Sequence, residues 1–325
     1  MIKSRSLILG FCVVASVLFC IGTMAKAHDD VELRLHLHPG QTFDQGIAME
    51  MKISKTSSKG HTDMSQVTHL KMHNQVLEVD NDGTIKMKMT FRAVAMKSSE
   101  VRDGKVRSNI EYDSAKPPQT TSPELKSTTA LVGQSLILTV SPRGEVVKID
   151  GVDAMVQRMA TDIKSPDMRS FLIPVFERSV ENMGRQMMGR INFAPEPVAI
   201  GDSWERPQTS PKSAPQLSFG EFTLMSIKDD IATIAVKSTS KPNPDAPLPG
   251  KNIRNIGALG TANGVIHVDA KTGLLRDFEI HSHSSGPIPP PAKSTSVKNK
   301  SASSWKLLKI ETETVMRGWT VQLPQ

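Results

Sequence analysis

The chain has 325 residues and a formal net charge of +7, and 4% of its residues are aromatic. With three tryptophans, one tyrosine and no dense run of lysine and arginine, it lacks the stacking surface and positive channel of a nucleic-acid-binding protein. We therefore expect no nucleic-acid partner.

Residues 1–27 have the pattern of a secretory signal peptide. A basic start precedes an apolar stretch at 7–21, and the Ala-Lys-Ala at 25–27 matches a cleavage site. This stretch is shorter than the ~20 residues that span a bilayer, and no later segment reaches that length. We expect an exported protein, periplasmic or extracellular and soluble after cleavage, with residues 28–325 forming one β-rich domain. Two weakly separated domains are the alternative.

Both cysteines, Cys12 and Cys20, lie in this leader, so the mature chain has no thiol. Cleavage also leaves 37 basic and 33 acidic residues, a formal charge of +4. Without disulfides or cysteine chemistry, the mature chain must be stabilised by a buried core, which its length can supply.

Apolar and polar residues alternate strictly at 31–38. This period of two predicts a strand with one face buried. His36 and His38 lie opposite its leucines, so we expect two solvated imidazoles and no metal site. The same alternation places His281 and His283 on a polar face, and a metal would need further ligands that converge in space.

The same period predicts ten further strands. Asp82-Gly83, the Ser-Pro-Arg-Gly ending at Gly144 and the Ala-Lys-Thr-Gly ending at Gly273 suit tight turns, because glycine adopts positive φ without strain. These turns predict antiparallel connections. The strands are expected at 47–53, 67–79, 85–96, 136–140, 145–149, 219–227, 231–238, 264–269, 274–283 and 305–316.

Between residues 151 and 191 the apolar spacing becomes helical. Ser165-Pro166 fits the N-cap and first turn of a second helix. We therefore predict an α+β fold, in which a curved antiparallel β-sheet packs on a central helical hairpin. The hairpin should bury Met168, Phe171, Val175 and Met183 and expose Arg178. Long surface connections are expected at 114–123, 207–216, 241–251 and 286–304.

Several short motifs fail in their context. Residues 78–89 match the front of a calcium-binding loop, but the twelfth position is Met89 where a glutamate is needed. The S-x-x-K motifs at 238–241 and 303–306 lie at strand edges, and the K-T-G at 271–273 lies at a predicted turn. No G-x-S-x-G or H-E-x-x-H occurs. We expect neither an enzyme nor a cofactor.

Methionine is the compositional oddity. Met49, Met51, Met87 and Met89 share the inward side of their predicted strands with Phe91. Methionine is flexible and polarizable, so it fills irregular cores and also lines surfaces that accept varied apolar ligands. Core filling is the commoner of these two uses. If the methionines line a ligand instead, these five residues form the candidate binding site. Copper(I) bound by thioethers is a third interpretation.

Four segments carry a family resemblance: "LRLHLHPGQTFDQGIAMEMKIS", "SPRGEVVKIDG", "VAIGDSWE" and "DAKTGLLRDFEI". They resemble exported bacterial proteins grouped as domain of unknown function 6263. The resemblance spans most of residues 31–316 and implies no catalytic residues. At the level of fold it also suggests periplasmic lipid and lipoprotein carriers, in which an incomplete barrel wraps apolar cargo and helices plug the opening.

Trp204, in "VAIGDSWE", begins a predicted strand after a turn at 201–203. It could anchor the sheet edge or line a cavity mouth, and we favour the anchor.

The function expected from these patterns is a non-enzymatic envelope protein that binds an apolar small molecule or lipid in a sheet-lined cavity. The alternative is a structural or interaction module with a filled core, whose partner is another envelope protein. A connected apolar cavity would distinguish the first from the second.

Overall fold

The structure is a computed structural model. It describes residues 30–57, 60–116, 129–161, 191–206, 216–243, 259–288 and 308–323, together with 169–170, 173–174, 176–177, 180–181 and 183–185. The expected signal peptide and most of the four expected surface connections lie outside the described residues. In the described part, no helix is both long and apolar enough to cross a membrane.

Twelve antiparallel strands form one sheet, which confirms the predicted antiparallel architecture. Every predicted strand from residue 47 onward is present, and most are longer than their apolar alternation indicated. The strands are β1 (Thr42–Ser57), β2 (Gly60–Val79), β3 (Ile85–Arg102), β4 (Lys105–Asp113), β5 (Ser135–Val140), β6 (Val146–Asp150), β7 (Ser203–Arg206), β8 (Gln216–Lys228), β9 (Ile231–Pro242), β10 (Leu259–Asp269), β11 (Leu275–Ile288) and β12 (Leu308–Gln322).

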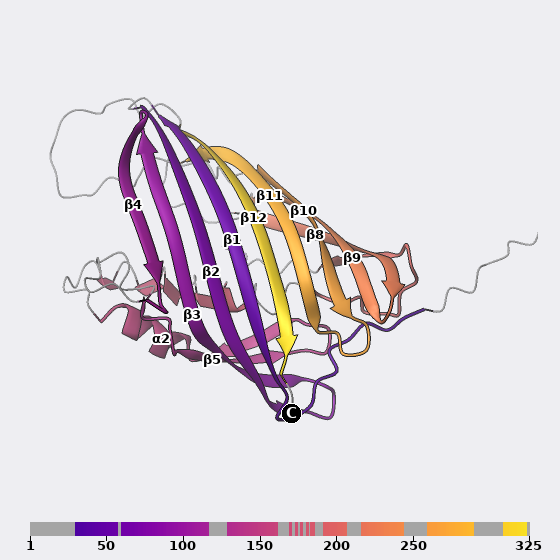
Figure 1. Ribbon diagram of the computed structural model, residues 1–325. Helices are drawn as coiled ribbons and strands as arrows, with labels where there is room; N and C mark the ends of the chain where they lie inside the picture. Colours follow the sequence, from indigo (N-terminus) through magenta and orange to yellow (C-terminus); the bar gives the residue numbers. More distant parts are fainter. Residues whose placement is uncertain are drawn as a thin grey trace, which may run out of the picture.

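The strand order is β6-β5-β3-β2-β1-β12-β11-β10-β9-β8-β7. The first part of β3 pairs with β5, and its later part pairs with β4. Most neighbours in the sheet are neighbours in sequence, as hairpin connections require. The exception that organises the sheet is β1 with β12, which pair from Phe43 opposite Gln322 to Thr56 opposite Lys309. The first and last strands of the chain thereby lie side by side in the middle of the sheet (Figure 1).

The three glycine turns adopt the predicted conformation. Gly83 (φ 80°), Gly144 (φ 83°) and Gly273 (φ 68°) lie at the β2–β3, β5–β6 and β10–β11 connections. At Gly273 a Cβ atom would also collide with the backbone carbonyl of Arg34, so this turn has no room for a side chain. Glycine is required there both for positive φ and for close approach of the chain.

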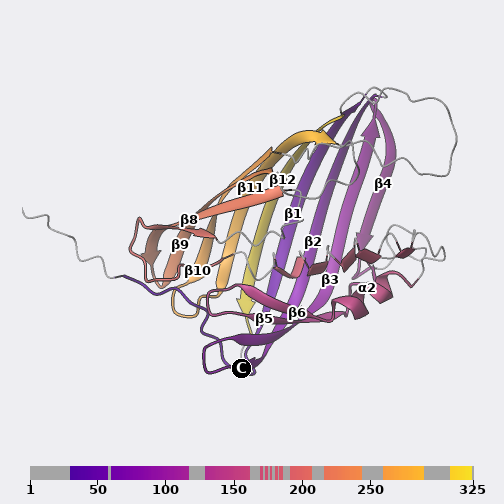
Figure 2. The same ribbon diagram turned by 180° about the vertical axis from the view of Figure 1, so that it is seen from behind.

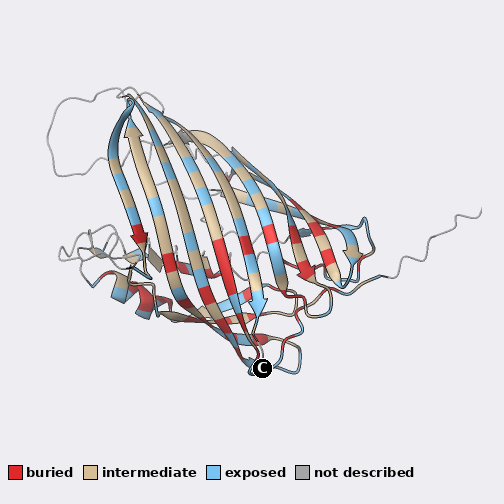
Figure 3. Ribbon diagram, in the orientation of Figure 1, coloured by how far each residue is buried: buried red, intermediate tan, exposed pale blue. Residues whose placement is uncertain are grey.

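The sheet curves strongly, and its two faces differ. In Figure 2, β5, β6 and α2 (Val152–Met159) lie in front of one end of β1–β3, on the concave side. We call this concave side the inner face and the opposite side the outer face. The end of the sheet where β1 begins and β12 ends is the core end, because the buried residues gather there (Figure 3).

The predicted helical hairpin is not confirmed. α2 begins after Gly151, and it buries Val152, Met155 and Val156 against the core. Helical residues recur between 169 and 185, where Val180 is buried and Met183 packs on the core. The predicted buried residues Met168, Phe171 and Val175, and the exposed Arg178, lie outside the residues whose side chains are described.

The segment at 31–38 is extended but is not the predicted strand. Its leucines are buried and His36 and His38 are exposed, so the predicted faces are confirmed. Its backbone, however, pairs in only one isolated bridge, Val31 with Val198. Alternation reports which side chains are buried, and it does not require that a neighbouring strand supply ladder hydrogen bonds.

One strand was not predicted. β4 reads Lys-Val-Arg-Ser-Asn-Ile-Glu-Tyr-Asp, and of its side chains only that of Tyr112 is fully buried. A strand that lies at a sheet edge and is largely exposed carries little apolar alternation, so the pattern of its sequence is weak.

Candidate functional site

The five predicted site residues fall into two environments. Met87, Met89 and Phe91 are fully buried at the core end, where Met87 and Met89 pair with Leu138 and Leu136 of β5. Met49 and Met51 lie on the same face of the sheet but farther from the core end, and both are half-buried. All five point inward, as predicted, but the structure brings only two of them to a partly accessible surface.

Beyond the core, β1 carries apolar side chains at successive inward positions. Apolar residues on the adjacent strands lie next to them and widen this surface. Met49 pairs with Met316 of β12 and with Thr68 of β2, and Thr68 pairs with Met96 of β3. Every apolar member of this surface is half-buried. We call this surface the methionine patch, and it consists of Met49, Met51, Ile53, Met64, Met96 and Met316.

The patch extends outward from the packed core. Met316 packs on the main core and Met96 on the small cluster around Val94 and Tyr112. Met49, Met51, Ile53 and Met64 belong to neither cluster among the described residues. From Met49 to Ile53 the inward positions of β1 cover about 13 Å, at roughly 3.3 Å per residue. The patch is therefore an apolar strip along β1.

Small and hydroxyl-bearing residues flank the strip. On the β12 side, Thr312 and Thr314 pair with Ile53 and Met51. Farther out the inward positions of β8–β11 hold only small residues at this level, which leaves their backbone closely approachable. These residues are Ser218, Gly220, Ser238, Ser240, Gly260, Ala262, Ser282 and Ser284.

A lysine ends the strip at the far end of β1. Lys55 is the next inward residue after Ile53, it is half-buried, and its Nζ lies 3.5 Å from Sδ of Met64. Thr62 pairs with Lys55 on one side and with Arg102 on the other, so both cations share one inward row. Sequence reasoning missed Lys55, Met64, Met96 and Met316. Counting alternate positions outward from Met51 reaches Lys55, but an irregularity in β3 after Phe91 shifts Met96 out of the alternation of Met87 and Met89, and Met64 and Met316 lie on other strands.

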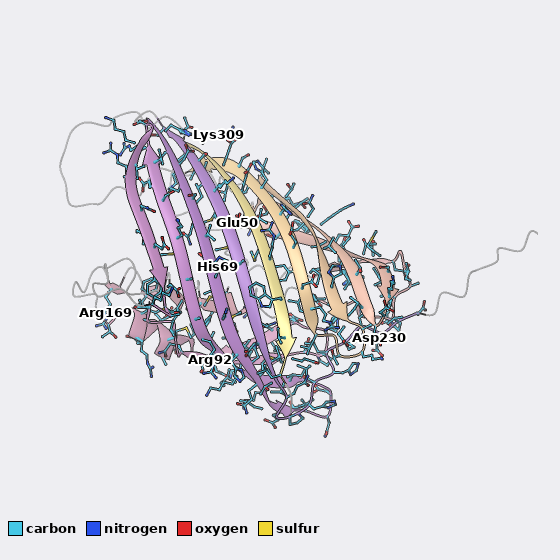
Figure 4. The ribbon with its side chains drawn as sticks, in the orientation of Figure 1. Glu50, His69, Arg92, Arg169, Asp230 and Lys309 are labelled. Atoms are coloured by element: carbon cyan, nitrogen blue, oxygen red, sulfur yellow. The ribbon has the colours of Figure 1, made fainter. Side chains whose placement is uncertain are left out.

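The outer face, in contrast, is polar. Arg317 Nε donates to Glu279 at 2.7 Å and its Nη1 donates to Glu50 at 3.2 Å, which links β11, β12 and β1. His281 Nε2 lies 2.6 Å from the other oxygen of Glu279. The hydrogen bond from Arg317, followed by that with His281, holds the pKa of Glu279 below its ordinary value. Figure 4 shows Glu50 on this face.

Four histidines of the described strands, His61, His73, His267 and His281, pair with carboxylates. His73 lies 2.7 Å from Asp44 and His267 lies 2.6 Å from Asp277. In the part of the chain that the structure describes, no three His, Cys, Asp or Glu side chains are grouped to hold a metal ion. His36, His38, His281 and His283 are all exposed, as their alternation predicted.

Trp204 is built into the sheet edge, as favoured from the sequence. Its ring stacks on Phe222 of β8 at 5.8 Å, and its Nε1 donates to the carbonyl of Asn192 at 2.7 Å. Only 7% of the residue is exposed. The indole thereby joins β7 to the segment that returns from the helical region.

Of the rejected motifs, the S-x-x-K at 238–241 lies inside β9, and the one at 303–306 lies outside the described residues. Lys271-Thr272-Gly273 forms the β10–β11 turn, in which Asp269 accepts hydrogen bonds from the backbone of Lys271 and Thr272. Asp82, in the calcium-like segment, accepts hydrogen bonds from the backbone and hydroxyl of Thr84. Both carboxylates stabilise hairpin turns.

The chain belongs to a family of unknown function, DUF6263, whose model matches residues 82–275. This confirms the resemblance found in the sequence. Curated protein sequences gave no match.

Among solved structures, similarity is limited to low scores. Lipovitellin, solved in a study of its lipid–protein interactions, aligns at a TM-score of 0.46 with 10% identity, over 89% of this chain and 26% of that one. OccK7 (OpdD) of Pseudomonas aeruginosa aligns at 0.26 with 7% identity, over 88% of this chain and 100% of that one. An outer membrane channel of Pseudomonas putida F1 aligns at 0.22 with 7% identity, over 88% and 97%. The chain thus spans about a quarter of lipovitellin.

Proposed function

We propose that this protein is a non-enzymatic, exported envelope protein that binds an apolar small molecule or lipid along the methionine patch. The observation that carries the proposal is the continuity of Met49, Met51, Ile53 and Met64 beyond the packed core. These four side chains are half-buried on a concave face and adjoin neither buried cluster of the described residues. Contiguous apolar surface of this kind marks binding sites more often than chance.

The chemistry of the patch favours binding over catalysis. Thioethers and aliphatic groups offer dispersion contacts, and methionine adapts its shape to ligands of different outline. The flanking threonine and serine hydroxyls can accept or donate single hydrogen bonds without fixing one ligand geometry. A strip about 13 Å long suits a segment of an extended acyl chain.

The filled core end supports a rigid receptor. Met87, Met89 and Phe91, all with 0% exposure, pack in one cluster with the leucines of 31–38 and with α2. In this proposal they hold the sheet in shape, and Met49 and Met51 retain the ligand-lining role. The competing function, an interaction module with a filled inner face, predicts no ligand at all.

The test is binding of an uncharged apolar fluorophore, N-phenyl-1-naphthylamine, to the mature protein. Met51→Gln keeps the shape of the side chain and adds a polar amide, so it should weaken binding several-fold and leave thermal unfolding nearly unchanged. Met225→Gln is the matched control, because Met225 is 54% exposed and lies on β8 at the register shift between Leu224 and Ser226, away from the patch. It should bind like the wild type.

A second measurement identifies natural cargo. Protein purified from an envelope fraction is analysed by native mass spectrometry, and its organic extract is examined for lipid. Absence of both probe binding and an extractable ligand would contradict the proposal and favour the interaction module.

A further inference from the structure

We infer that the ligand of the methionine patch is an anionic amphiphile, with its acidic head group at Lys55 and its tail along β1 toward the core. This inference rests on the proposed function and names the class of ligand. It is carried by the juxtaposition of a half-buried ammonium group with the end of an apolar strip.

The polar partner of Lys55 is a poor one. Among the described residues, the hydrogen bond of its Nζ is to the thioether of Met64, which is a weak acceptor. On the outer face, by comparison, Arg317 binds two carboxylates. A half-buried ammonium gains most from a charged acceptor, because charge-assisted hydrogen bonds are about twice as strong as neutral ones.

The charges around Lys55 favour an anion. In the described strands, the inward positions beyond Met49 carry four charged residues: Lys55, Arg102, Lys105 and Glu100. Glu100 lies on β3, where it pairs with Met64 of β2. It is thus two strands away from β1, a lateral distance of about 10 Å. Lys55 and Arg102 flank Thr62 in one row, and the Thr62 hydroxyl can donate to the same head group.

The geometry fixes the direction of the ligand. From Lys55 the inward residues of β1 run Ile53, Met51, Met49 and Ile47 toward the core, without a charged side chain. The far side of Lys55 holds Ser57 and the end of the strand. Along β1, an amphiphile bound by its head at Lys55 therefore has its apolar path toward the core, and Ile310 of β12 lies beside Lys55 in the same row.

The test compares two probes of equal chain length, palmitic acid and hexadecanol, in displacement of N-phenyl-1-naphthylamine from the mature protein. The wild type should bind the acid about tenfold more tightly than the alcohol, equivalent to roughly 1.4 kcal/mol. Lys55→Met retains the apolar stem and should remove this preference while leaving hexadecanol affinity unchanged. Lys55→Arg should restore most of it.

Lys52→Met is the matched control. Lys52 lies three residues away on the same strand, but it is exposed on the outer face opposite Ser65 and Glu313. It should leave both affinities unchanged. Equal binding of acid and alcohol by the wild type, or an acid preference that survives in Lys55→Met, would overturn the inference while the proposed function stands. Failure of both probes to bind would instead contradict the proposed function.

Discussion

Gly318 on β12 and Phe278 on β11 pair directly across the inner face, and the Phe278 ring occupies the space that a side chain at 318 would need. A Cβ atom at 318 would also lie 3.0 Å from the carbonyl oxygen of Gly46 on β1. An aromatic ring lying over a glycine on the next strand is a recognised device in curved sheets. Here it packs the centre of the sheet, where β1, β12 and β11 adjoin.

Replacing this glycine should destabilise the protein. Gly318→Ala forces the buried Phe278 ring or the β1 backbone to move, and overpacking of this kind costs about 1–3 kcal/mol. Urea unfolding of Gly318→Ala, Phe278→Leu and the double variant checks the cause. The double variant should be more stable than the sum of the two single effects predicts, because the smaller side chain makes room. Strict additivity would show that the ring is not the obstacle.

Trp204→Phe should cost about 1–3 kcal/mol. Phenylalanine keeps most of the stacking on Phe222 but leaves the buried carbonyl of Asn192 without its donor. Chemical denaturation measures the loss. Trp319→Phe serves as a control, since Trp319 is 40% exposed and should be less sensitive. Similar losses in both variants would assign the effect to ring size and not to the hydrogen bond.

The double substitution His36→Gln and His38→Gln should change stability by no more than about 0.5 kcal/mol, because both imidazoles are exposed. Thermal unfolding with and without added zinc checks this expectation. A stabilisation by zinc that disappears in the double variant would show that the two residues bind metal.

Removing Arg317 should raise the pKa of Glu279 toward its ordinary value. The hydrogen bond from Arg317 is the largest cause that lowers this pKa. A lowered carboxyl pKa stabilises the folded state above the unfolded-state pKa of about 4.3 and loses that contribution as the pH falls through the folded-state value. The stability advantage of the wild type over Arg317→Met should therefore shrink on acidification below about pH 4.3.

The carboxyl chemical shift of Glu279, followed by NMR across this pH range, measures the pKa directly. Lys148→Met is the control, because Lys148 pairs with Asp150 on β6, far from this network. The effect on stability should be small, since these outer-face charges are solvated and screened. An unchanged Glu279 pKa in Arg317→Met would contradict the assignment.

Two inward methionines should respond differently to truncation. Met89→Ala opens a cavity in the filled core and should cost about 2–5 kcal/mol. Met51→Ala removes a half-buried side chain at the patch and should cost about 1 kcal/mol or less. Denaturant midpoints and fluorophore binding, measured together, separate the two roles. Equal destabilisation would place Met51 in a filled core.

Much of the architecture was predictable from local patterns. Alternation identified the strands and their inward residues, and glycine at Asp82-Gly83, Gly144 and Gly273 identified three turns, because only local φ preferences and side-chain period are involved. The exposed face of the 31–38 segment followed for the same reason. β4 was missed because a largely exposed edge strand needs little apolar alternation.

The sequence by itself determined that Met49, Met51, Met87 and Met89 point inward, since a period of two assigns each residue to one face of an uninterrupted strand. The tertiary structure alone decided which of these methionines are fully buried. Met87 and Met89 are buried because β5 pairs beside them and the 31–38 segment and α2 complete the core. Met49 lies opposite Met316, and Met51 opposite Thr314, only because β12 pairs with β1 across more than 260 residues of sequence. Such long-range pairing depends on the packing of the whole sheet, and the single strand carries no record of its partner.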